Sequence, residues 1–368
     1  MDEWLPLLVL PNLELLTAVE CEGIMALVSI QDPRIETLMQ DHPQFRDFLF
    51  RFRATFGELR VPSIIIAHSS PPLTYRKADA VASFRDLISL SAVLRSRAAG
   101  LLHDNARVLF SDAFNIYPWM ITASYDAVWG SSPAFQGAHI LERFAGQTFP
   151  EVPTFSMSDH DLDRPLLDAL LLRWRRHYSG RRVRWSDRAL FRSLNMANEA
   201  AQSPSGVLST YYDGGRSIGL WVSACEILSH PRTAQASKRT VFSLLEKVEW
   251  IDPKLGYRRY LTEKTRSKGG RVPTRRNLAC SIYNRIYNVR NDFLHGNPVS
   301  SSKLLFPGRK KALSNYAACI YRLALSGYLP LPTRSVLKKT KDYTEYLITV
   351  GRHFTPQRMI EKGLKRSM

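Results

Sequence analysis

The residues with the clearest chemical potential lie in the segment IYNRIYNVRNDFLHGNPV, positions 282–299. Arg290, Asn291 and His295 are spaced there as R-N-x-x-x-H. An imidazole exchanges protons near neutral pH, a guanidinium offers a fixed positive fork that matches phosphate oxygens, and an amide adds a neutral donor. A ribose 2′-hydroxyl that attacks its own phosphodiester needs groups of these kinds. The pattern therefore predicts RNA cleavage without a metal, with Arg290, Asn291 and His295 as catalytic residues.

The surrounding pattern indicates that a helix carries this motif. Apolar residues recur at three- and four-residue steps, as in one buried stripe of an amphipathic helix: Leu278, Ile282, Ile286, Val289 and Phe293. Gly296 and Pro298 follow the histidine and are stop signals. Asn291 and His295 are four residues apart and share a face, and Arg290 is long enough to lean over it. We expect the three side chains to converge at the end of the helix.

The arginine–histidine spacing alone decides little. A chain with nine histidines and many arginines contains about one such pair by chance. The alternative interpretation is a histidine that caps a helix beside a solvated arginine. Tyr287, Asn291, Gly296 and the apolar stripe favour a functional site over this alternative.

The decapeptide YNVRNDFLHG resembles the signature of HEPN proteins, in particular the Apea-like HEPN group. The stretches RALFRSLNMANEAA (188–201) and SIGLWVSACEILSH (217–230) are similar to earlier helices of that domain. The likeness covers roughly residues 184–331, with a looser likeness before them. It implies an all-helical bundle that pairs with a second copy and brings two motifs into one composite, metal-independent ribonuclease site. It also implies a role in prokaryotic antiviral defence or as a toxin, restrained by an antitoxin or trigger protein.

Three neighbouring residues are expected to support the motif. In the resemblance, an acidic residue matching Glu226 lies inside the bundle, where it would pair with an arginine such as Arg290; the alternative is a solvent-facing position. Asp292 would orient His295 or face water, since three residues of separation permit contact without establishing it. Tyr287 belongs to the matched signature.

The net charge of +18 is unevenly distributed along the chain. Residues 1–150 hold 12 Lys or Arg and 16 Asp or Glu, a net charge of −4, whereas residues 151–368 hold 39 and 17, a net charge of +22. The basic clusters are RRVRW (181–185), KTRSKGGRVPTRR (264–276), GRKK (308–311) and KKTK (338–341). Such clusters neutralise phosphates with little regard to base sequence. A solvated, solubilising surface is the alternative for any single cluster.

The segment SKGGRVPTRR (267–276) leads directly into the motif helix. Its glycines and basic residues indicate a flexible cationic loop that folds over a phosphate backbone, or an ordinary surface connector. Pro273 and Thr274 are expected to mark the helix start, with Thr274 as its cap. We expect RNA to be bound by Arg271, Arg275, Arg276 and Arg285.

The chain length and 45% hydrophobic content suit two domains with buried cores. We expect an α+β protein: a mixed amino-terminal domain (1–155), an all-α HEPN-type bundle (165–335) and a basic tail (336–368) with a short helix near 343–350. SIIIAH (63–68) predicts a strand, and the apolar repeats at 78–98 and 166–174 predict helices. The aromatic segment 117–129 fits a strand or a helix. The function of the amino-terminal domain is left open.

Other chemical groups are less suggestive. His68, His103 and His139 lack spaced ligand partners, so a structural role is favoured over metal binding. Arg173, Arg175, Arg176 and His177 form a rival active-site group, for which a solvated or RNA-contacting face is the favoured interpretation. The amino-terminal half contains no phosphate loop, nucleotide fingerprint or nucleophile elbow.

The sequence favours a cytoplasmic location. No run of 18 apolar residues predicts a membrane span, and the apolar opening WLPLLVLPNLELL follows two acidic residues and contains two prolines, which disfavours a signal peptide. Cys21, Cys225, Cys280 and Cys319 are scattered, which favours buried, reduced thiols over disulfides or zinc. We expect no metal or cofactor.

Our functional hypothesis is a homodimeric, metal-independent endoribonuclease of the HEPN type. His295 would transfer protons, Arg290 would stabilise the phosphorane, and Asn291 would position the phosphate. The alternative is a non-catalytic HEPN module that binds RNA or a partner protein through the same basic bundle.

Overall fold

The computed structural model describes residues 4–366 except for 12, 54–56, 58, 105, 107, 115–119, 122–126, 133–134, 141–156, 181, 203–209, 268–269, 308–310, 332–341 and 350–353. Contacts divide the chain into two compact units, each made of several segments. The first contains Met1–Asp86, Phe110–Leu162 and Leu171–Val183; the second contains Leu87–Leu109, Asp163–Leu170 and Arg184–Met368. The boundaries expected from the sequence, near residues 155–165 and 335, remain predictions.

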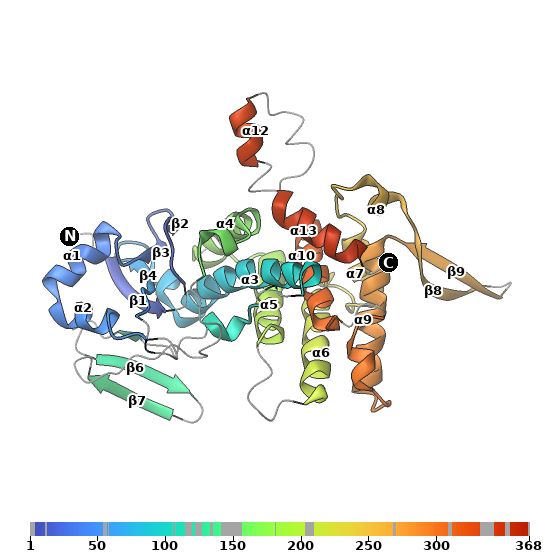
Figure 1. The fold of residues 1–368 in the computed structure, drawn as a ribbon, viewed down its shortest axis with the longest axis horizontal. Helices are drawn as coiled ribbons and strands as arrows, with labels where there is room; N and C mark the ends of the chain where they lie inside the picture. Colours follow the sequence, from blue (N-terminus) through green and yellow to red (C-terminus); the bar gives the residue numbers. More distant parts are fainter. Residues whose placement is uncertain are drawn as a thin grey trace. The chain divides into compact units, whose positions relative to one another are not determined.

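A four-stranded antiparallel sheet lies at the centre of the first unit (Figure 1). In spatial order its strands are β1 (Trp4–Leu10), β4 (Ser63–His68), β3 (Met25–Ser29) and β2 (Val19–Cys21). The expected strand SIIIAH is therefore confirmed as β4, an inner strand whose first five residues are buried. Helices α1 (Pro33–Asp41) and α2 (Pro43–Leu49) share one apolar core with the sheet, through Ile35 and Phe45.

In the described residues of the amino-terminal half, the remaining elements are a small sheet, two longer helices and short 3₁₀ helices. The sheet is antiparallel, with strands β5 (Met120–Ile121), β6 (Ala127–Ser132) and β7 (Phe135–Ile140). The 3₁₀ helices are η1 (Leu73–Arg76), η2 (Ser111–Phe114) and η4 (Asp159–Asp161). Helices α3 (Ala78–Leu102) and α4 (Arg164–Tyr178) contain the two predicted helical repeats and contribute residues to both units. The described parts of segment 117–129 are strands; the rest of it lies outside the described residues.

The second unit is mostly helical. From residue 184 onward, the part of the chain that the structure describes contains α5 (Trp185–Ala200), α6 (Tyr211–Leu228), α7 (Lys238–Leu245), α8 (Pro253–Tyr257), β8 (Tyr260–Ser267), β9 (Gly270–Arg276), α9 (Leu278–Leu294), η5 (Ser301–Leu304), α10 (Leu313–Tyr328), α12 (Tyr343–Thr349) and α13 (Thr355–Lys365). Helix α6 packs against α5, α9 and α10. The prediction of a mixed α+β protein is confirmed. The prediction of an all-helical bundle is not met, because two strands interrupt it.

Those two strands form an antiparallel ribbon that extends from the start of α9 (Figure 1). The predicted loop 267–276 is thus wrong, since β8 pairs with β9 in a register that matches Ser267 with Gly270. The Gly-Gly dipeptide at 269–270 was the available hairpin signal. Thr274 is also not the helix cap, because it lies within β9.

The helix cap is Asn277, whose side-chain oxygen accepts a hydrogen bond from the backbone N–H of Cys280 at 3.0 Å. Its side-chain amide donates to the carbonyl of Leu245 at 3.1 Å, so the same residue ties the helix start to α7. An asparagine cap satisfies a donor that the first turn leaves open. A buried residue therefore fixes the start of the motif helix.

Two helices follow the second unit's main elements in the sequence. The predicted helix near 343–350 is confirmed as α12, whereas α13 was not predicted. Helix α13 buries Ile360 and Leu364, and the carboxylate of its Glu361 accepts from the backbone N–H groups of Ile251 and Asp252 at 2.7 and 2.8 Å. This basic region thus includes a helix that packs on the body of the unit.

Helix α10 is the most thoroughly buried helix of the second unit, with buried residues on all its faces. It contains a buried ion pair: Arg322 Nε lies 2.5 Å from Asp163 Oδ2, with the two side chains 2% and 1% exposed. Asp163 Oδ1 also accepts from the N–H of Leu166 and so caps α4. Within the described residues, no helix combines the length and apolar character needed to cross a membrane.

All four cysteines are free and buried. Burial raises the pKa of the thiols of Cys21 to about 11 and of Cys280 and Cys319 to about 12, and it raises that of Cys225 as well. A thiol with a raised pKa is rarely a thiolate at neutral pH and is therefore unreactive. The expectation of buried thiols is confirmed.

We expect Arg322→Met to destabilise the protein by about 3–5 kcal/mol, because it leaves the Asp163 carboxylate buried without its partner. The double variant Asp163→Asn, Arg322→Met removes both charges and keeps a capping side chain, so it should recover a large part of this loss. Urea unfolding measures both. Arg192→Met, at an exposed position of α5, should change stability by less than about 0.5 kcal/mol. An equal loss in the single and double variants would refute the uncompensated-charge explanation.

Candidate active site at the end of helix α9

Helix α9 positions the R-N-x-x-x-H motif by burying its opposite side. The predicted apolar stripe is confirmed: Leu278, Ile282, Ile286 and Val289 are buried, and Phe293 is half-buried. These side chains fix the rotation of the helix against α6 and α10. With that stripe inward, the motif residues lie at the helix end and along its edge.

The helix ends at Leu294, with His295 as its C-terminal cap, as the stop signals predicted. The backbone N–H of His295 donates to the carbonyl of Asn291 at 3.0 Å. Gly296 then adopts a left-handed conformation (φ +71°), and the N–H of Asn297 donates to the carbonyl of Asp292 at 2.9 Å. A glycine accommodates this left-handed turn without steric cost. The chain therefore turns away immediately after the histidine, whose side chain is exposed.

Arg290 lies within a polar cluster formed by α6 and α9. Its Nη1 donates to the side-chain oxygen of Asn291 at 3.0 Å, and its Nη2 lies 3.8 Å from Glu226 Oε2. The guanidinium also lies over the ring of Tyr287, 5.8 Å from the ring centre. Its side chain is 23% exposed, and its buried Nε has no hydrogen-bond partner among the described residues. The guanidinium is thus oriented, and one donor still lacks an acceptor.

Glu226 lies on α6 facing the motif helix, with a side chain that is 19% exposed. Burial raises the pKa of its carboxyl above the ordinary value, and the charge of Arg290 opposes that rise. This placement agrees with the paired interpretation and not with the solvent-facing alternative. The 3.8 Å separation makes the ion pair a loose one.

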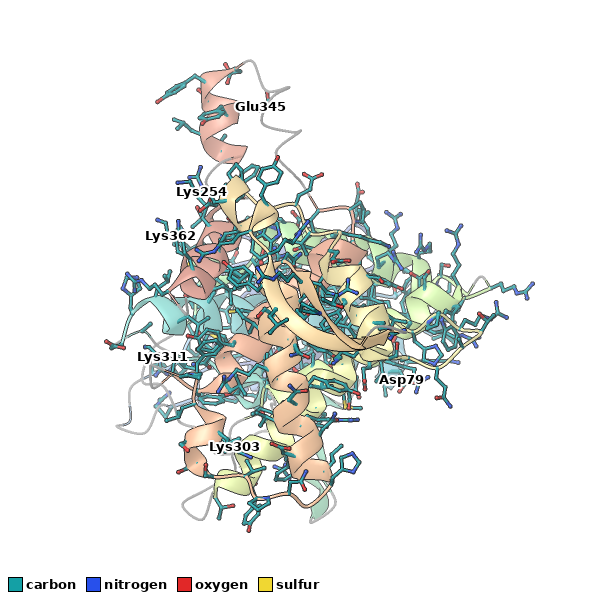
Figure 2. All side chains as sticks on the ribbon, turned by 90° about the vertical axis from the view of Figure 1, so that its right-hand side faces the viewer. Asp79, Lys254, Lys303, Lys311, Glu345 and Lys362 are labelled. Carbon is teal, nitrogen blue, oxygen red and sulfur yellow. The ribbon has the colours of Figure 1, made fainter. Side chains whose placement is uncertain are left out.

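Asp292 is held by the segment that follows the helix. Lys303 Nζ lies 3.1 Å from its Oδ2, and the side-chain amide of Asn297 donates to its Oδ1 at 3.4 Å. Lys303, labelled beside the lower part of α9 in Figure 2, also donates to the carbonyl of Pro298 at 2.9 Å. The hydrogen bond from Lys303 lowers the pKa of the Asp292 carboxyl. Through these contacts Asp292 holds the turn that follows the histidine. Among its described contacts none involves His295.

Tyr287 is contacted by two cations, one of which the sequence did not indicate. Lys238 of α7 places its Nζ 5.5 Å from the centre of the Tyr287 ring and donates to the side chain of Asn284 at 3.1 Å. The neighbouring Tyr283, whose ring lies 6.1 Å from that of Tyr287, is almost fully buried. Its hydroxyl has no hydrogen-bond partner among the described residues. Lys238 is distant in sequence from the motif, so only the packing of α7 on α9 reveals it.

The four arginines expected to bind RNA have different surroundings. Arg275 is exposed on β9, whereas the side chain of Arg271 lies outside the described residues. Arg276 pairs with Glu246 at 2.9 Å and lies over the ring of Phe242. Arg285 is half-buried, with its guanidinium 5.4 Å from the centre of the Phe306 ring. Of the three whose side chains are described, Arg275 has the ordinary exposure of a surface phosphate contact.

The rival group stands on the last turn and a half of α4: Arg173, Arg175, Arg176 and His177. His177 packs edge-on against Tyr178 at 4.7 Å between ring centres, and the carbonyl of Arg175 accepts from the hydroxyl of Tyr75 at 2.9 Å. Of the three histidines assigned a structural role, His68 accepts from the N–H of Ser70 and packs against Trp4. The side chain of His139 lies outside the described residues.

The last turns of α9 thus carry an exposed imidazole at His295 and a guanidinium at Arg290 that contacts an amide and a carboxylate. Among the described contacts none joins the side chain of His295 to Arg290 or Asn291, so the expected convergence of the three side chains remains a prediction. Such a set can exchange a proton and stabilise a negatively charged oxygen. Among the described residues, no group of three or more His, Cys, Asp or Glu side chains is arranged to hold a metal ion. Comparisons with protein-family models, curated proteins and solved structures gave no match to this chain.

We expect Gly215→Ala to destabilise the protein by about 1–3 kcal/mol, because a Cβ there would lie 2.4 Å from the Phe293 ring, where α6 and α9 meet beside the motif. The matched control is Gly219→Ala, one turn further along α6, where nothing lies within 4 Å of the new Cβ. That variant should gain about 0.4–1 kcal/mol. Thermal unfolding compares them, and a loss at both positions would contradict the steric explanation.

We expect Glu226→Gln to alter the dependence of stability on pH. Because the pKa of Glu226 is raised in the folded state, the stability contributed by its protonated form is fully present below its ordinary value near 4.5. That contribution is lost as the pH rises through the raised pKa. The wild type should therefore lose stability relative to Glu226→Gln as the pH increases through this window. Urea midpoints at several pH values measure the difference, and the exposed Glu249→Gln should follow the wild type. Parallel curves for Glu226→Gln and wild type would contradict the raised pKa.

Proposed function

We propose that this protein is a metal-independent endoribonuclease of the HEPN type. The observation that carries the proposal is the arrangement of Arg290, held by Asn291, Glu226 and Tyr287, close in sequence to the exposed His295. The resemblance of the decapeptide YNVRNDFLHG to the HEPN signature supports the same assignment.

In this proposal, the 2′-hydroxyl of a ribose loses its proton and attacks the adjacent phosphorus, and the 5′-oxygen of the next nucleotide leaves with a proton. His295 serves in proton transfer, since its imidazole is accessible. Arg290 stabilises the charge of the phosphorane through its guanidinium, whose side chain is 23% exposed. Asn291 positions the phosphate. The products carry a 2′,3′-cyclic phosphate and a 5′-hydroxyl, and no water or metal is consumed.

A second copy of the chain completes the site. The reaction needs one group to accept a proton and another to donate one, whereas the motif holds a single histidine. A twofold pair would supply both imidazoles to one phosphate, with two guanidinium groups beside it. The net charge of +22 over residues 151–368 favours a polyanionic substrate. A role in antiviral defence or as a restrained toxin is part of the same proposal.

The test is cleavage of labelled RNA in the presence of EDTA. We expect the wild type to cut, His295→Ala to lose about 10²–10⁴-fold in rate, and Arg290→Ala to lose about 10²–10³-fold. End-group analysis should detect the cyclic phosphate. The matched controls are His160→Ala and Arg192→Ala, which remove an exposed histidine and an exposed arginine elsewhere and should retain the wild-type rate.

Three results would contradict the mechanism: cleavage abolished by the chelator, equal cleavage in wild type and both motif variants, or 3′-phosphate products with no cyclic form. Retained RNA binding without any cleavage would favour the non-catalytic binding module. A monomeric protein at concentrations that give full activity would remove the composite site from the proposal.

A further inference from the structure

A cavity of about 620 Å³ lies along α9, within the second unit. Arg258, Tyr260 and Leu261, at the base of the β8–β9 ribbon, form one part of its wall. Lys303 and Phe306, from η5 and the residues after it, form another. Its volume lies within the range of sites that bind small organic ligands. Arg285, Asp292 and Lys303 are among the residues that line it.

The cavity uses a different face of α9 from the motif. Ser281, Arg285, Asn288 and Asp292 line it at three- and four-residue steps. Arg285 and Arg290 are five positions apart, which corresponds to about 140° around the helix axis. The cavity is therefore separate from the Arg290–Glu226 cluster, although the same helix carries both.

Arg285 is the unusual charge in this cavity. Its Nε is buried without a hydrogen-bond partner among the described residues, and none of their acidic side chains forms an ion pair with it. Burial accordingly lowers the pKa of its guanidinium. Lys303, in contrast, is already neutralised by Asp292 at 3.1 Å. A partly desolvated guanidinium that lacks a counter-charge is costly, and an anionic ligand would supply that charge.

The rest of the wall suits a flat organic group next to that anion. The Arg285 guanidinium lies 5.4 Å from the centre of the Phe306 ring, which is itself 4.3 Å from the ring of Tyr316. Leu261 presents an apolar side chain that is 52% exposed, and the exposed Asn288 offers an amide for hydrogen bonding. A bare phosphate ion gains nothing from an apolar wall, whereas a nucleotide uses the charge, the aromatic ring and the amide together.

We propose that this cavity binds one nucleotide of a single-stranded RNA, with its phosphate at Arg285 and its base against the wall that contains Phe306 and Leu261. RNA as the source rests on the proposed function, and a free nucleotide offers the same chemistry. By helical rise, Arg285 and His295 are separated by about 15 Å along α9. The cavity therefore holds a nucleotide at a distance from the scissile phosphate and anchors the strand without taking part in cleavage.

The experiment measures binding of a fluorescent single-stranded RNA by anisotropy, in the His295→Ala background and in EDTA, so that no cleavage interferes. Arg285→Met keeps the length of the side chain and removes its charge. We expect about 10-fold weaker binding and a salt dependence reduced by about one phosphate contact. Calorimetry with adenosine 5′-monophosphate and with inorganic phosphate, on wild type and Arg285→Met, tests the free ligands.

A second variant guards against misfolding of the first. Asn288→Asp adds a negative charge at an exposed position of the cavity and should weaken RNA binding without loss of the folded structure. Its matched control is Asn195→Asp, at an exposed position of α5, which should bind as the background protein does. Thermal unfolding of each variant establishes that it is folded.

Unchanged RNA binding in folded Arg285→Met and Asn288→Asp would overturn the proposal. Binding of the monophosphate that requires Arg285, together with unchanged RNA binding, would assign the cavity to a free nucleotide and would also overturn RNA as its ligand. The nuclease is judged separately. RNA binding through Arg285 without cleavage would refute the nuclease and support the cavity assignment. Cleavage that depends on Arg290 and His295, with no effect of Arg285 on RNA binding, would support the nuclease and refute the cavity assignment.

Discussion

The close approach of α6 and α9 is the constraint on which the polar cluster at the end of α9 depends. Gly215, near the start of α6, lets the ring of Phe293 lie against the α6 backbone. Three turns further along α6, Glu226 reaches Arg290. The two helices thus meet at an apolar contact, between Gly215 and Phe293, and at a charged contact, between Glu226 and Arg290. The distance between the helix axes that the apolar contact sets determines whether the charged contact forms. Packing of this kind tolerates little added volume, because protein interiors are filled to crystal-like density.

Local patterns in the sequence were sufficient to locate the motif helix and several other elements. The apolar stripe from Leu278 to Phe293 and the stops after it describe α9 well, and SIIIAH describes β4, because each pattern reflects burial on one element. The ribbon before α9 was predicted as a loop because its glycines and basic residues are also typical of flexible surface connectors. The Gly-Gly dipeptide was the signal for a hairpin. Helix α13 was missed because its apolar residues are few and its anchor, Glu361, is a charged residue whose burial depends on Ile251 and Asp252, far away in the sequence.

The site was predictable in residue type and less so in arrangement. Sequence spacing selected Arg290, Asn291 and His295, yet Lys238 beside Tyr287 and the cavity around Arg285 arise from segments that only folding brings together. For Asp292 the sequence left open a contact with His295 or a position facing water, and the structure shows a bridge to Lys303 of η5. Charge counts also overstate the free positive surface: Arg276 and Arg322 are engaged with Glu246 and Asp163. Part of the positive charge of residues 151–368 is therefore neutralised by acidic side chains within the protein.

The inert thiols make the protein convenient for spectroscopy. Because Cys21, Cys225, Cys280 and Cys319 are buried and their pKa values are raised by that burial, maleimide reagents at neutral pH have little access to a native thiolate. One cysteine introduced on an exposed turn would then carry a spin label or a fluorophore without prior removal of the native four. Double electron–electron resonance would measure the distance between spin labels on two chains. That distance would report how any assembled pair is arranged in solution, independently of whether it acts on a nucleic acid.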